Sequence, residues 1–112
     1  MNTRAQALPD AVAQGLSTLG LQLEVARKRR KLTKGQLQEA AMITAQTYGR
    51  LIRGEPGITL GVLGRVLHAL NLESTLLAIA DPATDQYGIA LELARAKKPG
   101  KDNDDGKLDT NF

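Results

Sequence analysis

The side chains of this 112-residue chain that are best suited to chemistry are cationic, and they gather in one part of the sequence. Residues 27–53 contain eight Arg and Lys side chains and a single acidic one, Glu39. Residues 54–96 contain two basic and five acidic side chains, so the excess of positive charge is local. Such a concentration of cations is expected of a surface that binds phosphate groups.

Hydrogen-bonding side chains follow this basic stretch at the start of a predicted helix. Gln46, Thr47 and Arg50 can face base edges, and the fork of Arg50 fits the two acceptors of guanine in the major groove. Lys34 is expected to be a phosphate anchor, and Thr44 a helix cap more than a base reader. The residues predicted to contact DNA are Arg27, Arg30, Lys34, Thr44, Ala45, Gln46, Thr47 and Arg50.

The sequence has few residues suited to metal binding, catalysis or the stacking of single-stranded nucleic acid. There is no Cys and a single His, His68, so no metal site and no metal or other cofactor is expected. No nucleophile is paired with a base, so the chain is not expected to be an enzyme. Aromatic residues make up 3%, too few for stacking on single strands. The first residues lack a long apolar run, so neither a signal peptide nor a membrane span is expected, and the predicted location is cytoplasmic.

The first helix is predicted to begin near Pro9 and Asp10, because Pro fits the first helical position and an acidic side chain suits the positive end of the helix dipole. Its apolar stripe recurs at helical spacing up to the basic stretch. Gly15 and Gly20 are two positions at which this helix is expected to break. The stripe consists of Val12, Leu16, Leu19, Leu23 and Ala26.

Two short helices are predicted next, over residues 34–41 and 45–53. Thr33 and Gln36 have the spacing of a capping box before the first, and Thr44 is an N-cap for the second. Gly54 suits the left-handed position that ends the second helix. Two short helices joined by about three residues have the layout of a helix-turn-helix, whose second helix enters the major groove of double-stranded DNA.

Three more helical segments complete the predicted all-α fold. Thr59 is expected to cap one that ends near Asn71, Ser74 to cap a short one, and residues 87–94 to form an amphipathic one. The fold is thus a compact five-helix domain with an extra C-terminal helix and a disordered tail. The predicted divisions are an N-terminal arm (1–15), the DNA-binding domain (16–80), the C-terminal helix (81–98) and the tail (99–112).

Over residues 19–72 the chain resembles the lambda-repressor-like (XRE) helix-turn-helix family. The motifs that carry the resemblance are ARKRRKLT (26–33), RGEPG (53–57), TL (59–60) and RVLHALNL (65–72). With ADPATD (80–85), the chain looks like the HipB-like regulators. That narrower resemblance implies an antitoxin that binds a HipA-type kinase toxin and represses its own operon.

The chain departs from the family's usual residues at several positions. Lys34 stands where Gln is usual, Gln38 where Ala is usual, and Met42 where the turn usually has Gly. Tyr48 replaces an aliphatic residue of the third helix, and Ile52 replaces a Glu. Gln38, Met42 and Tyr48 stand at positions that define the internal packing of the motif. One of these residues is therefore expected to have changed to accommodate another.

The sequence leaves several alternatives open. The cations of residues 27–31 either contact phosphate or neutralise the C-terminal end of the first helix. A homodimer is predicted through the stripe of Tyr87, Ala90, Leu91 and Ala94, with the Val12 stripe of the first helix as the other possible interface. The competing function is a protein-interaction module, an antitoxin or adaptor whose helix-turn-helix is degenerate.

Overall fold

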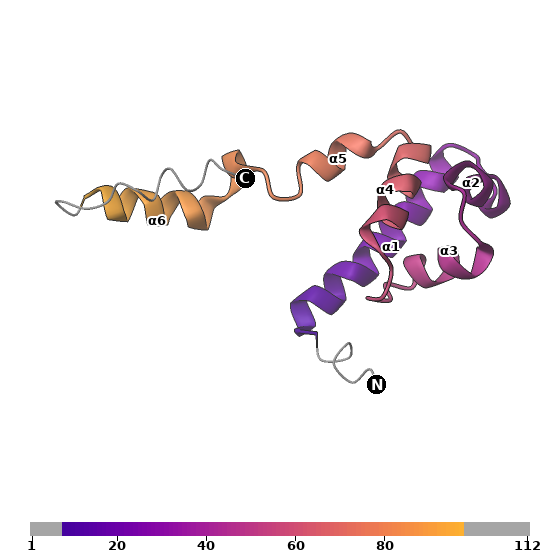
Figure 1. Ribbon diagram of the computed structural model, residues 1–112, viewed down its shortest axis with the longest axis horizontal. Helices are drawn as coiled ribbons and strands as arrows, with labels where there is room; N and C mark the ends of the chain where they lie inside the picture. Colours follow the sequence, from indigo (N-terminus) through magenta and orange to yellow (C-terminus); the bar gives the residue numbers. More distant parts are fainter. Residues whose placement is uncertain (1–7, 98–112) are drawn as a thin grey trace. The chain divides into compact units, whose positions relative to one another are not determined.

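The computed structural model describes residues 8–97, and all the regular structure in that part of the chain is helical (Figure 1). The predicted all-α fold is confirmed. The tail predicted to be disordered, and the first seven residues of the predicted N-terminal arm, lie outside the described residues. The chain divides into two compact units, 1–76 and 77–112. The domain boundaries predicted from the sequence stay predictions.

Five helices lie in or begin in the first unit: α1 (Asp10–Arg29), α2 (Lys34–Ala41), α3 (Ala45–Ile52), α4 (Leu60–Ala69) and α5 (Glu73–Leu77). The helix α2 packs against α3 and α4, and α1 packs against α3 (Figure 1). Their inward side chains form one core, which is aliphatic apart from a single tyrosine. The core residues are Leu23, Ala26, Leu37, Ala41, Tyr48, Leu51, Val66, Leu67 and Leu70.

Local capping decides where most of these helices begin. Thr33 and Gln36 make the predicted capping box, since each side chain bonds the backbone N–H of the other residue at 2.9–3.0 Å. The hydroxyls of Thr44 and Thr59 accept the backbone N–H groups of Thr47 and Val62, as predicted for α3 and α4. The predicted Ser74 cap is wrong, because α5 begins one residue earlier, at Glu73.

Left-handed residues decide where several helices end. Gly54 (φ 79°) and Asn71 (φ 64°) adopt the predicted conformation. Lys31 (φ 55°) and Met42 (φ 59°) adopt it as well, although a side chain there costs roughly 1–2 kcal/mol relative to glycine. Met42 therefore takes the backbone conformation of the glycine that the family usually has in this turn.

The predicted break in the first helix is wrong, because α1 runs without interruption through Gly15 and Gly20. Gly20 is buried where α1 meets the end of α3. A Cβ atom there would lie 2.1 Å from the Ile52 carbonyl oxygen. Gly20 therefore allows the backbones of α1 and α3 to approach closely, and it has a packing role instead of a helix-breaking one.

The second unit contains a short 3-10 turn, η2 (Pro82–Thr84), and the helix α6 (Gln86–Ala96). The Asp81 and Asp85 side chains cap these two elements by accepting the backbone N–H groups of Ala83 and Gly88. The helix predicted over residues 87–94 is confirmed and is slightly longer than expected. No helix in the described part of the chain is long and apolar enough to span a membrane.

We predict that Gly20→Ala destabilises the protein by about 1–3 kcal/mol or more, because the added Cβ forces α1 away from α3. Gly15→Ala is the matched control in the same helix, since nothing lies within 4 Å of a Cβ at that position. The control should stabilise the protein by roughly 0.5–1 kcal/mol. Urea denaturation followed by circular dichroism measures both, and equal effects would show that the close approach at Gly20 is unimportant.

Candidate nucleic-acid interface

The outward face of α3 is the strongest candidate for a surface that reads another molecule. Tyr48 and Leu51 are buried beneath the helix. Gln46, Arg50 and Arg53 follow one another at intervals of four and three residues, so they share the opposite face, and all are exposed. We call these three residues the reading face of α3.

The N-terminus of α3 presents hydroxyl groups beside this face. Thr44 Oγ1 accepts the backbone N–H of Thr47 and donates its own proton to Thr47 Oγ1, both at 3.0 Å. The Thr44 proton is therefore used internally, and the Thr47 proton is the one left to donate outward. Ala45 and Gln46 are exposed in the first turn, and backbone N–H groups at a helix start attract anions.

Arg50 and Arg53 share one carboxylate. Arg50 Nε lies 3.3 Å from Glu55 Oε1, and Arg53 bonds Glu55 Oε2 at 3.0 and 3.2 Å. These bonds lower the pKa of Glu55, and the bond from Arg53 has the largest effect. Arg53 is the C-cap residue of α3, and its guanidinium pairs with Glu55. Arg50 therefore faces solvent with its orientation already restrained.

Five exposed cations surround the end of α1 and the start of α2, and we call them the basic rim. They are Lys28, Arg29, Arg30, Lys31 and Lys34. Arg30 donates one of its N–H groups to the Ala26 carbonyl at 2.8 Å, so it also neutralises the end of α1. The rim has the cations and the exposure that contact with phosphates requires.

Arg27 does not belong to this rim, although we predicted it as a DNA contact. Its side chain is buried, with 8% of the residue exposed. Its guanidinium bonds both Glu24 carboxylate oxygens at 2.8 and 3.1 Å and the Leu32 carbonyl at 2.7 Å. Sequence reasoning could not separate Arg27 from its exposed neighbours, because its partners are defined by the folded chain. We therefore leave Arg27 out of the interface.

Glu24, a residue that the sequence did not single out, links α1 to α3. Its carboxylate also accepts a hydrogen bond from the Tyr48 hydroxyl. The bonds from Arg27 and Tyr48 outweigh burial and lower the pKa of Glu24 to about 2, and the charge of Lys34 acts in the same direction. We call Glu24, Arg27, Tyr48 and the Leu32 carbonyl the Glu24 network. Tyr48 lies in the core, and its hydroxyl is satisfied there.

Arg65 bonds the Ala41 carbonyl at 3.1 Å and so ties α4 to the end of α2. This intramolecular bond favours a structural role over a phosphate contact. His68 is exposed and lies 3.2 Å from Glu73. Within residues 8–97, no three His, Cys, Asp or Glu side chains come together as metal ligands would.

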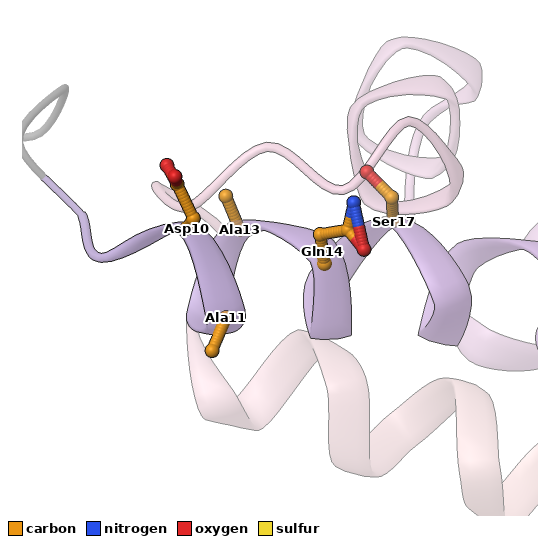
Figure 2. Close-up of a pocket in the computed structure, with 5 residues that line it drawn as sticks. All are labelled: Asp10, Ala11, Ala13, Gln14 and Ser17. Atoms are coloured by element: carbon orange, nitrogen blue, oxygen red, sulfur yellow. The ribbon is translucent and has the colours of Figure 1, made fainter.

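A hollow along α1 does not resemble a ligand site. Its volume is about 530 Å³, and it is lined by Asp10, Ala11, Ala13, Gln14 and Ser17 (Figure 2). Figure 2 shows Asp10, Ala13 and Ser17 on one side of the helix, with Ala11 pointing away. A single carboxylate on an open helix surface does not orient a ligand, because pockets that do so converge several polar groups on a concave lining.

Residues 23–77 match the family described as Helix-turn-helix. The matched segment includes α2, α3, α4 and α5 in full, and the last turns of α1. This match supports a DNA-binding transcription regulator of the lambda-repressor-like kind, and the family is not one of enzymes. Comparison with the curated proteins and with solved structures gave no significant match.

We predict that Glu24→Gln lowers stability at pH 7 by about 1–3 kcal/mol, because a charge-assisted bond becomes a neutral one. The folded pKa of Glu24, about 2, lies below its ordinary value of 4.5. Its stabilisation is therefore complete above about pH 4.5 and is lost as the pH falls toward 2. Thermal melts from pH 7 to pH 2.5 should show the two proteins converging in acid, and a constant difference would contradict the assignment.

Proposed function

We propose, from the helix-turn-helix domain that residues 23–77 form, that this protein is a sequence-specific DNA-binding transcription regulator that acts as a homodimer. The reading face of α3 is the observation that carries the proposal. It is exposed, it begins at a capped helix N-terminus, and it belongs to a small domain that also carries the basic rim. Base readers and phosphate cations are the two kinds of contact that specific DNA binding requires.

In this proposal the two sets of residues have different tasks. The basic rim, including the predicted anchors Arg30 and Lys34, contacts phosphates and displaces condensed counterions, which supplies affinity on any sequence. The helix α3 enters the major groove, where Gln46, Thr47 and Arg50 meet base edges. Ala45 offers an apolar contact in the first turn, and Thr44 keeps its role as the cap.

The pairing of Arg50 with Glu55 is compatible with base reading. An exposed ion pair contributes roughly 0–1 kcal/mol, whereas a bidentate bond to guanine is worth about 1–3 kcal/mol of discrimination. The bond to guanine is worth more than the ion pair, so Arg50 can leave Glu55 and bind a correct base. A wrong base leaves Arg50 with its internal partner, so the energy available for selectivity is the bond to guanine less the ion pair that it replaces.

The helix α6 supports the homodimer. It has eleven residues and no buried side chain. Tyr87 and Leu91 lie on one face, and Ile89 and Leu93 lie on another, and all four are exposed. Isolated helices of this length are marginal in water, so such a helix needs an apolar partner. A second copy offers the same surface about a two-fold axis, and two recognition helices then meet half-sites about 34 Å apart.

We further propose that the protein is an autorepressing antitoxin whose toxin is a HipA-type kinase. The support is the HipB-like ADPATD sequence of residues 80–85 after the helix-turn-helix motifs, together with exposed apolar surface for a partner chain. The test is to express the product of the neighbouring gene with this protein and ask whether the two copurify and whether kinase activity falls. A neighbouring metabolic operon would instead favour a stand-alone regulator.

We predict that binding to duplex DNA weakens steeply with salt, with a log–log slope of about −0.9 for each phosphate neutralised.

Lys34→Ala should weaken binding to all sequences alike and reduce the slope by about one. Arg50→Ala should cost about 1–3 kcal/mol on the preferred site and relax selection at one base pair. Fluorescence anisotropy against preferred and random duplexes between 50 and about 200 mM salt measures these effects.

Two outcomes would oppose this assignment of roles. If both variants lost selectivity equally, the division between phosphate anchor and base reader would be wrong. A flat salt dependence of the native protein would remove the basic rim from any DNA interface. That result would favour the protein-interaction module, which the departures at Gln38 and Met42 also suit.

We predict that Leu91→Asp gives a monomer that keeps the helices of the first unit but loses affinity for a two-fold symmetric site. Burying a new carboxylate in an apolar dimer contact is strongly unfavourable. Gln86→Asp is the matched control, because it adds the same charge at the exposed start of α6. Sedimentation velocity gives the oligomeric state. If the Leu91→Asp variant is still a dimer, the interface lies elsewhere, and the next candidate is the stripe of Val12, Leu16 and Leu19.

A further inference from the structure

The Glu24 network connects the three elements that carry the proposed DNA contacts. Tyr48 in α3 donates its hydroxyl proton to Glu24 in α1. Arg27, one turn further along α1, bonds the same carboxylate at 2.8 and 3.1 Å. Arg27 also bonds the Leu32 carbonyl at 2.7 Å, immediately before the Thr33 cap of α2. A continuous chain of hydrogen bonds thus runs from the entry of α2 to the centre of α3.

Tyr48 is the feature of this network that packing alone does not require. Only 1% of the residue is exposed, and its companions in the described core are Leu, Ala and Val. An aliphatic side chain could fill such a core without burying a hydroxyl and an ion pair. Because desolvating a buried ion pair costs free energy, replacement by apolar residues is often neutral or stabilising. Stability is therefore a weak reason for the network.

Unlike apolar packing, the network restrains the orientation of α3. Apolar contacts are non-directional, whereas a hydrogen bond tolerates little change in distance or angle. A rotation of α3 by about 10° would move an atom about 8 Å from its axis by roughly 1.4 Å, and a shift of that size away from Glu24 is more than a hydrogen bond tolerates. Burial and Glu24 raise the pKa of Tyr48 to about 12, so the hydroxyl keeps the proton it donates.

We propose that Tyr48, held by Glu24, is a positioning residue that fixes the rotation of α3 about its axis and thereby sets the selectivity of DNA reading. Tyr48 touches no DNA itself, because it lies on the buried face of the helix. It acts through Gln46 and Arg50, which leave the same helix on the opposite face. A bidentate contact from Arg50 to a base needs this precision, and a phosphate contact from the basic rim does not. The inference rests on the proposed function.

The test uses the full chain and its Tyr48→Phe variant, which keeps the ring and removes the hydroxyl. A preferred duplex is first selected from a random library with the native protein, and both proteins are then measured on it and on a scrambled duplex. We expect the variant to keep its helical circular dichroism and to bind the scrambled duplex within twofold of the native protein. Its preference for the selected duplex should fall about tenfold, the range of one base contact.

Thr18→Val is the control, since it removes a hydroxyl from an exposed position in α1 that no proposed contact uses, and it should change neither affinity. A second pair of variants covers the case in which Tyr48→Phe does not fold. Glu24→Gln keeps a carbonyl oxygen that can accept the Tyr48 proton, and Glu24→Ala has none. Glu24→Gln should therefore retain at least threefold more of the sequence preference than Glu24→Ala.

The outcomes separate the inference from the function on which it rests. A native protein that selects no duplex would refute the proposed function, and the inference with it. If the native protein selects a site and a folded Tyr48→Phe variant keeps the same preference within twofold, the network is structural only and the inference is wrong. Equal preference in the two Glu24 variants would also overturn it.

Discussion

The structure depends on how one carboxylate is satisfied inside a small aliphatic core. Glu24 is mostly buried, and leaving its charge unpaired there would cost several kcal/mol. Arg27 supplies the opposite charge, and Tyr48 supplies a further donor. Because Glu24 bonds both partners, and Arg27 also bonds the Leu32 carbonyl, the network joins the last turn of α1, the entry into α2 and the middle of α3. A different position of α3 would leave Glu24 paired with Arg27 but would break its bond from Tyr48, so the network disfavours such rearrangements.

The close contact of α1 and α3 makes this network possible. A tyrosine hydroxyl reaches a carboxylate on a neighbouring helix only if the two backbones have a fixed separation. Gly20 sets that separation on one side, because its missing Cβ leaves space for the Ile52 backbone. Ile52 stands where the resembling family usually has Glu, and its backbone lies against Gly20. The departures at Tyr48 and Ile52 therefore both lie where α1 and α3 meet.

The sequence predicted what local chemistry decides. The Thr33 capping box, the Thr44 cap and the left-handed Gly54 depend on residues within one turn of one another, and all three are confirmed. The sequence failed where distant residues decide. The break at Gly20 was wrong because Ile52, more than thirty positions away, makes glycine a packing residue. Arg27 looked like its basic neighbours because only the folded chain brings Glu24 and the Leu32 carbonyl around it. The DNA-contacting residues themselves stay predictions.

The positions of the two sets of cations suit the different contacts proposed for them. Phosphates repeat along DNA whatever its sequence, so a cation that binds them loses little by moving, and a lysine's long exposed stem is adequate. A base edge presents its acceptors in one geometry, so a side chain that reads it must start from a fixed place. The basic rim occupies helix ends and a turn, where side chains are exposed. The reading face lies on α3, the helix held from beneath by a buried tyrosine. The directional bond from Tyr48 to Glu24 therefore lies beneath the surface that, in the proposed function, needs a fixed direction.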